Sequence, residues 1–551
     1  MRTPMVFALA FVCAALTGTP AALADPPVPL GAGLTERDWR AEASRDAEPD
    51  AQEFKLINYF FTRVSVTNQL ADPSGLRGVS LGPIGIGENA GSSTSVGGDT
   101  TTAYIEQRWI PVLSYSPWFA DGMATFRAQF EIDYQWGQAA NQIQNNQGGG
   151  LNADQVNIQT KAVHVSLHPL RDPAKLTLVI GTQPIYDNVY DPNTTSLFDI
   201  VKTGYKLAFI GSDATGLSVF SRMGGNWKAS FIPIGTGQPD KAEKGDPSPA
   251  YVYMLTGDYD YELAPGTHIG ASLWHLRDDT EGTAFAFEGL VKSGPGSTGL
   301  FPYTGTPNFQ IEEASGSVTW AGVNFNHNIH FNTGPWAASG FFMFNSGSYK
   351  NNKENSGLND KLDISGYSAN FELMYNHGKT QGDMLTFETM ITSGDDDVSD
   401  DKYTGAFTLN NYGLPGAVWF NHKTLILFPF TSTVSNYTGA VTDISNRGFG
   451  LQSAILTGSK DLIPDKLNLK LGAAFAQSAA DPPPVDTEGV LIARGRTIGV
   501  EVNAELRYHI RYLMTVGLHG GILKVGDFYD ANPQVTTNPW AVFSTFTWYG
   551  F

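Results

Sequence analysis

Two short motifs in the chain have the spacing of catalytic or cofactor-binding loops. Residues 78–82 read GVSLG, the G-x-S-x-G pattern that presents a nucleophilic serine between a strand and a helix. Residues 294–299 read GPGSTG, the G-x-G-x-x-G pattern of dinucleotide sites. The first is followed by PIGIGENAGSS, which cannot form a helix, and the second lies in a loop rich in glycine and proline. We therefore predict no catalytic residues, no cofactor and no enzyme activity.

A run of aspartates has the oxygen ligands that a divalent cation prefers. The candidate ligands are Asp395, Asp396, Asp397, Asp400 and Asp401. The run lacks the glycine turn and the terminal glutamate of an EF-hand loop. A solvated loop facing lipopolysaccharide is the favoured interpretation, so we predict no metal site.

The remaining chemistry is electrostatic and comes from charged residues that share one face of predicted strands. These residues are Arg127, Glu131, Asp133, Lys161, Asp258, Asp260, Glu262, Glu372, Glu388, Glu501, Glu505, Arg507 and Arg511. Charges in a solid core are costly unless they are paired, whereas a water-filled lumen hydrates them. We predict that they line a pore in which the excess of carboxylates favours cations. The alternative is that such pairs only brace the wall.

Strict alternation of apolar and polar residues defines this face, most clearly over residues 124–136. Phe130 and Ile132 alternate there with Glu131 and Asp133. Successive side chains of a strand point to opposite faces, so one face is apolar and the other polar. The segment exceeds the roughly 5–6 residues of a typical globular strand and matches a membrane-crossing strand of about 9–11 residues with an interfacial extension.

Twenty segments of the chain show such a pattern to some degree. They begin near Phe54, Thr102, Ala124, Gln155, Leu176, Tyr205, Leu217, Trp227, Tyr251, His268, Val318, Ala337, Leu362, Met384, Thr424, Phe449, Leu467, Thr497, Met514 and Pro539. Residues 217–222 and 227–233 are short, and the run near Thr424 lacks clean alternation. Because single-chain bacterial barrels have even strand numbers, we predict an all-β fold, a transmembrane antiparallel β-barrel of 18 strands, with a range of 16 to 20.

The connections between these segments fall into two length classes. Long stretches rich in glycine, asparagine and serine cover residues 75–101, 138–154, 281–310, 351–360 and 395–411. Short joints cover residues 119–122 and 263–266. This pattern predicts long extracellular loops and short periplasmic turns, and any of the long loops can fold back into the lumen.

The first residues have the features of a secretory signal peptide. Arg2 precedes an apolar run over residues 5–16, and residues 22–24 read ALA before Asp25. We predict a signal peptide over residues 1–24, a periplasmic N-terminal tail over residues 25–53 and an outer-membrane β-barrel over residues 54–551. The single cysteine, Cys13, falls in the segment that would be removed.

The C-terminal segment reads NPWAVFSTFTWYGF and ends on an aromatic residue. Tyr549 and Phe551 stand in one alternating register, which resembles the C-terminal signature by which bacterial outer-membrane barrels are recognised for assembly. We predict that Tyr549 and Phe551 form the assembly signal and that the barrel-assembly machinery is a partner. A soluble β-domain that ends in an aromatic strand is the disfavoured alternative.

The charge balance argues against one class of partner. The chain carries 35 Lys and Arg residues against 54 Asp and Glu residues, a net charge of −19, without a basic cluster. A nucleic-acid partner needs such a cluster to displace phosphate counterions. We expect no nucleic acid, and outer-membrane lipid and lipopolysaccharide as the surroundings.

The layout resembles that of the alginate-export-like outer-membrane barrels. The resemblance is carried by LTLVIGTQ at residues 176–183, SLFDIVKTGYKLAF at residues 196–209 and MITSGDDD at residues 390–397. It implies an 18-stranded barrel, and the best-known member of that family passes an anionic polysaccharide through an arginine-rich constriction. The predicted inward set here holds more carboxylates than arginines, which suits a neutral polysaccharide, small polar nutrients or cations better.

These features together predict a channel in the bacterial outer membrane. It would pass polar solutes or a polysaccharide by passive diffusion or export, with periplasmic export partners in the second case. An integral outer-membrane hydrolase would need an exposed Ser/His pair at the lipid face, and no motif suggests one. A structural or adhesive barrel would need a closed lumen, which a conductance measurement would exclude.

We expect Phe130→Arg to destabilise the barrel by roughly 2–4 kcal/mol, because it places a charge in lipid near the bilayer midplane. Gln129→Arg, one residue away on the polar face, should fold normally. Unfolding titrations in lipid vesicles would measure both variants. Equal stability of the two would show that the register or the membrane assignment is wrong.

Overall fold

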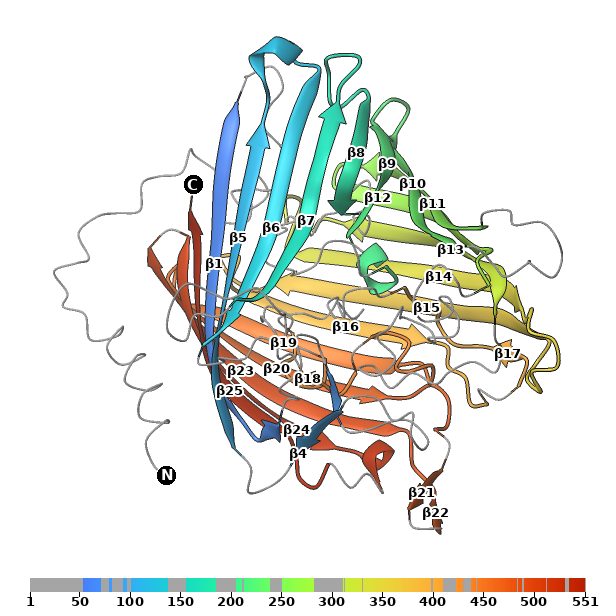
Figure 1. The fold of residues 1–551 in the computed structure, drawn as a ribbon. Coiled ribbons are helices and arrows are strands. Elements are labelled where there is room, and N and C mark those ends of the chain that lie inside the picture. The colour runs from blue at the N-terminus through green and yellow to red at the C-terminus, as the bar shows by residue number, and fades with distance from the viewer. Residues whose placement is uncertain are drawn as a thin grey trace.

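The chain forms a closed antiparallel β-barrel, drawn from a computed structural model in Figure 1. The structure describes residues 53–70, 79–81, 93–96, 101–136, 155–184, 205–210, 213–237, 250–281, 311, 313–329, 331–397, 400–409, 423–428, 430, 438–441, 443–482, 484–487, 490–511, 513–530 and 535–550. The wall strands are β1 (Phe54–Thr67), β5 (Thr102–Tyr115), β6 (Ala124–Gln135), β7 (Gln155–Leu167), β8 (Thr177–Pro184), β9 (Asp213–Ser221), β10 (Asn226–Gly237), β11 (Ala250–Ala264), β12 (Thr267–Asp278), β13 (Ser315–His327), β14 (Trp336–Lys350), β15 (Lys361–Asn376), β16 (Met384–Thr392), β19 (Gln452–Ile463), β20 (Leu467–Gln477), β23 (Thr497–Arg511), β24 (Met514–Val525) and β25 (Trp540–Gly550). Within these described residues, eighteen strands pair with their neighbours along the chain, and β1 closes the ring against β25. The predicted fold class and strand number are confirmed.

Short elements lie between the wall strands. They are β2 (Gln69–Leu70), β3 (Val79–Leu81), β4 (Ser93–Val96), β17 (Lys402–Tyr403), β18 (Thr438–Gly439), β21 (Val485–Thr487), β22 (Val490–Ile492) and the 3-10 turns η3 (Trp118–Ala120), η4 (Tyr205–Ala208) and η7 (Asp527–Tyr529). β18, β3, β4 and β2 form a small sheet, β21 pairs with β22, and β17 pairs in parallel with β15. In the described part of the chain, no helix is long and apolar enough to cross a bilayer.

The outer face of the wall carries an apolar belt. Phe130 is 37% exposed on this face of β6, whereas its neighbours Glu131 and Asp133 are buried on the inner face. Exposed apolar side chains recur on the successive strands from β10 to β25, and they are Phe231, Leu255, Leu273, Val323, Phe342, Phe371, Phe387, Leu456, Leu471, Val502, Ile522 and Val542. Such a belt is the surface that a membrane-crossing barrel presents to lipid.

The connections alternate in length around the ring. The connection between β1 and β5 is long and the one between β5 and β6 is short, and this order continues to β25. All long connections therefore leave one end of the barrel, the loop end, and all short ones leave the other, the turn end. Gly266, in the short joint after β11, has a φ of +73°, a conformation that glycine adopts without strain. The two predicted length classes are confirmed, and the compartment that each end faces stays a prediction.

Two of the twenty predicted segments are not wall strands. The segment at Tyr205 forms the η4 turn, and the segment at Thr424 forms a turn. Both are buried throughout their described residues and lack a polar face, which a wall strand needs toward the lumen. The short segments at residues 217–222 and 227–233, by contrast, belong to β9 and β10 of the wall.

The apolar outward face of β23 does not extend to Ile498. Ile498 continues the apolar face of that strand in the sequence, yet it is fully buried and belongs to the interior core. The register shifts here, because Ala476 pairs with Gly499 and Gln477 with Thr497. Ile498 is therefore the extra residue of a β-bulge, which reverses the direction of its side chain.

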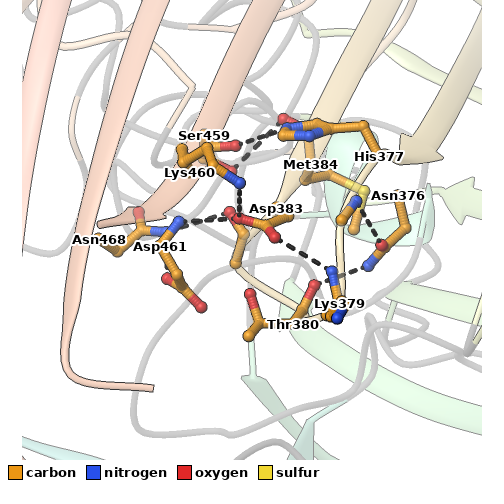
Figure 2. A network of polar contacts seen from close by, with 12 residues as sticks. Asn376, His377, Lys379, Thr380, Asp383, Met384, Ser459, Lys460, Asp461 and Asn468 are labelled. Carbon is orange, nitrogen blue, oxygen red and sulfur yellow. Dashed lines mark hydrogen bonds and ion pairs between the residues drawn. The ribbon is translucent and has the colours of Figure 1, made fainter. Parts of the chain in front are cut away.

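A polar network joins two neighbouring turns at the turn end (Figure 2). The Oδ1 atom of Asp383 accepts hydrogen bonds from the Asp461 N–H at 3.0 Å and from Lys460 Nζ at 3.2 Å. Its Oδ2 atom accepts one from the Lys379 N–H at 3.2 Å. The Asp461 N–H holds the pKa of Asp383 below its usual range, and Lys460 and the Lys379 N–H act in the same direction. Asn468 adds a hydrogen bond to the Gly382 carbonyl, so the β15–β16 turn is fixed to the β19–β20 hairpin.

We expect Asp383→Asn to lower the melting temperature at neutral pH, because an amide replaces the carboxylate that accepts these hydrogen bonds. A lowered folded-state pKa stabilises the fold above the unfolded-state value, near 4 for an aspartate, and this stabilisation is lost as the pH falls through the folded-state pKa. The difference between wild type and variant should therefore shrink in acid. Asp396→Asn, in an exposed loop, is the control. A difference that is independent of pH would contradict the role of the carboxylate.

Candidate functional site

Ion pairs between neighbouring strands line one part of the inner wall. Arg63 on β1 contacts Glu106 on β5 at 2.6 Å. Arg108 on β5 donates two hydrogen bonds to Asp133 on β6, of 2.9 and 3.1 Å, and lies 3.0 Å from Glu131. All five side chains are buried on the inner face. These charge-assisted contacts, of which the one between Arg108 and Asp133 is bidentate, fix the guanidinium groups in place.

The opposite part of the inner wall carries large buried aromatic side chains. Trp274 on β12 and Trp320 on β13 are completely buried, and Phe341 on β14 is 4% exposed. They belong to a core cluster that also contains residues of the long connections. Side chains of the wall alone cannot fill a barrel of this size. At these places, residues of the long connections fill the space between the wall side chains.

The η4 segment, residues 205–210, is held inside the barrel by an ion pair. Lys206 has no solvent exposure and contacts the carboxylate of Asp258 on β11. Asp258 also accepts hydrogen bonds from Ser272 Oγ at 2.5 Å and Trp274 Nε1 at 2.9 Å. The ring of Tyr205 stacks on Trp274 with a centroid distance of 5.9 Å. The carboxylate is satisfied from both the wall and the inserted segment.

A second inserted segment, residues 403–409, lies beside the first. Ile210 and Leu409 form a parallel β-bridge between the two segments. Trp320 Nε1 donates to the Phe407 carbonyl at 2.8 Å, and the Phe407 N–H donates to Asn345 Oδ1 at 3.2 Å. Polar atoms of β13 and β14 therefore satisfy the backbone of this segment.

A third inserted segment, residues 423–428 together with Phe430, lies against the wall from β15 to β25, and we call it the strap. Lys423 contacts both Glu372 on β15, at 2.5 Å, and Glu388 on β16. Glu501 on β23 accepts hydrogen bonds from backbone N–H groups of the strap. Phe430 packs on Phe543 of β25 with a centroid distance of 5.0 Å.

The carboxylate of Glu505 on β23 contacts three basic side chains. Its Oε1 lies 2.6 Å from Arg507 Nε and 3.3 Å from Lys470 Nζ. Its Oε2 lies 2.8 Å from His519 Nδ1. The His519 ring stacks on Phe543 at 4.6 Å, which links this cluster to the aromatic contact of the strap.

Most of the predicted lining residues face the barrel interior. Those buried there are Arg127, Glu131, Asp133, Asp258, Asp260, Glu372, Glu388, Glu501 and Glu505. Arg127 donates to Gln129 at 3.0 Å, and Asp260 lies 2.8 Å from His268 Nδ1. The structure thus brings the predicted charges into close contacts with partners, as the bracing alternative expects. Their exposure to a passing solute stays a prediction.

Three predicted lining residues lie elsewhere or are not described. Glu262 is exposed and accepts a hydrogen bond from the Gly266 N–H, because a register shift after it ends the regular pairing of β11. Arg511 is exposed at the last position of β23, at the turn end. Lys161 falls at a register shift of β7, and its side chain is outside the described part of the structure.

One residue of the aspartate run, Asp395, fixes the conformation of its loop through hydrogen bonds. Asp395 is buried, and its two carboxylate oxygens accept the N–H groups of Asp397 and Thr404, each at 2.9 Å. Burial raises the pKa of Asp395, which the two N–H groups partly offset. Asp396 and Asp400 are exposed. Among the described residues, no group of three His, Cys, Asp or Glu side chains could hold a metal ion.

Seven Lys and Arg residues of the described interior were not part of the predicted set. They are Arg63, Arg108, Lys206, Lys228, Lys423, Arg447 and Lys470. Arg63 and Arg108 occupy inward positions of β1 and β5, and alternation within those strands was the signal that could have found them. Lys206 and Lys423 come from inserted segments, for which the sequence has no such signal. These cations offset the predicted excess of carboxylates, on which the expected cation preference depended.

The structure describes only part of the predicted assembly signal and of the GVSLG and GPGSTG motifs. Tyr549 is buried on the inner face of β25 and packs on Tyr59 at 5.0 Å. Phe551 lies outside the described residues, as do residues 1–52 and 294–299. Ser80 of the GVSLG motif lies in β3 and pairs with β18 and β4. The role of Tyr549 and Phe551 in assembly stays a prediction.

No family of sequences matches this chain, and no curated protein matches it. Solved structures with a similar fold include OprD of Pseudomonas aeruginosa, with 11% identity, a TM-score of 0.42, and coverage of 92% of this chain and 99% of OprD. OpdK of P. aeruginosa, solved with vanillate, has 11% identity and a TM-score of 0.43 over 90% of this chain and 98% of its own. A BenF-like porin from Pseudomonas fluorescens Pf-5 has 11% identity and a TM-score of 0.44 over 90% and 98%. These values are too low to assign a family or a solute, and the resemblance to the alginate-export-like barrels receives no support from them.

We expect Arg108→Met to destabilise the barrel by about 3–5 kcal/mol, because it removes the guanidinium that two neighbouring buried carboxylates contact. Arg171→Met is the matched control. Arg171 pairs with Asp121 at 2.7 Å, but both side chains are more than half exposed, so its loss should cost roughly 0–1 kcal/mol. Unfolding titrations in lipid vesicles would measure both. Equal losses would show that the inner wall is hydrated like the outer surface.

Proposed function

We propose that this chain is a passive channel of the bacterial outer membrane for small polar solutes. The observation that carries the proposal is the set of three inserted segments, each fixed by contacts to the inner wall, within a closed barrel that has an apolar outer belt. A barrel of this size without inserted segments would leave a wide aqueous lumen. The segments narrow that lumen while the charged residues of the wall remain inside it.

The chemistry of the interior supports polar solutes of either charge. Guanidinium groups of Arg63 and Arg108 lie on β1 and β5, and carboxylates of Glu372 and Glu388 lie on β15 and β16. Each of these clusters also holds the opposite sign, because Arg63 and Arg108 contact Glu106, Glu131 and Asp133, and Lys423 contacts Glu372 and Glu388. Polar solutes of either charge therefore meet a complementary group, and the low-dielectric wall strengthens the field of each group. An extended polysaccharide needs a continuous wide path, so the inserted segments favour small solutes over the polysaccharide that the family resemblance implied.

The surroundings in this proposal are outer-membrane lipid and lipopolysaccharide at the apolar belt. The barrel-assembly machinery would deliver the chain to that membrane through its C-terminal strand. An integral hydrolase receives no support from any arrangement of described residues. A structural barrel with a closed lumen is the second outcome that the experiment below distinguishes.

We expect purified protein to form discrete ion-conducting channels in planar bilayers. Swelling of protein-loaded liposomes should be fast in solutions of small sugars or amino acids and slow in solutions of oligosaccharides, because the inserted segments set the limiting width. Heat-modifiable protein that conducts no ions would support the closed structural barrel. Equal swelling rates for small and large saccharides would contradict the narrowing and favour a polysaccharide path.

A further inference from the structure

The strap spans the inner wall between two polar contacts and one aromatic contact. At one end Lys423 lies between the carboxylates of Glu372 and Glu388. At the other end Phe430 packs on Phe543 and on the ring of His519, at 5.0 and 5.4 Å. The first end contacts β15 and β16 and the second contacts β24 and β25, with the wall strands β19, β20 and β23 between them in the described sheet order.

The middle of the strap is fixed by a single carboxylate. Glu501 Oε1 accepts the Leu425 N–H at 2.7 Å, and its Oε2 accepts the N–H groups of Ile426 and Leu427 at 2.9 and 2.5 Å. Three successive backbone N–H groups that converge on one anion form the kind of concavity called a nest. Asn503 Nδ2 donates a fourth hydrogen bond to Oε1 at 2.8 Å. The Glu501 side chain is fully buried, so these donors replace its hydration.

Further backbone contacts of the strap run to a second loop segment, residues 438–441. The Ile426 and Leu427 carbonyls accept hydrogen bonds from the N–H groups of Ala440 and Val441, each at 2.9 Å. Asn503 Nδ2 also donates to the Lys423 carbonyl, at 3.2 Å. The strap is therefore joined to the wall by the Glu501 carboxylate, which fixes its backbone, and by its own apolar side chains, which are buried in the interior core. Each wall strand, by contrast, is joined to its neighbours by a ladder of backbone pairs.

We propose that the strap is a movable constriction of the channel and that the Glu501 carboxylate holds it in the narrowed position. This inference rests on the proposed channel function. Loss of the carboxylate leaves three N–H groups of the strap without their acceptor in a buried place, where an unsatisfied donor is costly. The strap then gains by moving to where water reaches those groups, and the path beside it widens. Glu501 is therefore a positioning residue, because it affects the solute path only by holding the strap in place.

The decisive variant is Glu501→Ala, which empties the nest and leaves room for a free carboxylate. We expect a larger single-channel conductance with more frequent current steps than in wild type. Amide hydrogen exchange of Leu425, Ile426 and Leu427 should accelerate by about tenfold or more, since each loses a bond to a charged acceptor. Acetate should reverse both effects by occupying the nest, and chloride at the same ionic strength should not.

The control is Asp383→Ala, which also removes a carboxylate that accepts backbone N–H groups but lies at the turn end, outside the lumen. Its conductance and its exchange at residues 425–427 should match wild type. Lys423→Met, in the strap itself and outside every wall strand, is the second variant should Glu501→Ala not fold, and it should also raise conductance.

Conductance and strap exchange in a folded Glu501→Ala or Lys423→Met variant that equal those of wild type would overturn the proposal. Rescue by chloride as well as by acetate would also overturn it, because the effect would then follow ionic strength and not the nest. A wild-type protein that conducts no ions would instead refute the proposed channel function. The exchange measurement does not depend on conduction, so the two failures are distinguishable.

Discussion

Hydrocarbon offers no partner for a backbone N–H or C=O, so every such group inside a bilayer must be paired within the protein. A sheet meets this demand only when it has no open edge, which is why β1 must return to β25. β1 and β25, the first and last strands of the barrel, pair from Asn58 opposite Gly550 to Thr67 opposite Ala541. An enclosed interior follows directly from closure.

The interior is too wide for wall side chains to fill, so it must hold either water or more of the chain. Here it holds parts of the long connections, among them the three inserted segments. Each segment brings polar backbone groups and side chains into a buried place. Wall residues supply the ion-pair and hydrogen-bond partners, as Asp258 does for Lys206 and Glu501 for the strap. These charges can be buried because each is paired. Loss of one partner would leave the other charge buried without compensation for its lost hydration, which is strongly destabilising.

The same pairing decides what the proposed channel can do. Charges that are fixed by partners cannot rearrange freely around a solute, so they act as a preorganised field. The clusters on β1, β5 and β6 and on β15 and β16 lie in different parts of the ring, and each holds both signs of charge. In the proposed channel, movement of the strap would change the width of the path while the ladder of the wall stays intact, because side chains such as Glu501 and not strand pairing join the strap to the wall.

The sequence by itself determined the barrel. Alternation placed Phe130 outward and Glu131 inward, and the lengths of the connections separated loops from turns, because both signals are local and repeat along the chain. Only the tertiary structure decided what fills the barrel. The segments at Tyr205 and Thr424 look like weak strands, and the partners of Lys206 and Lys423 lie 52 and 35 to 51 residues away in the chain. Such contacts follow from where closure places distant strands, and no local pattern encodes that placement.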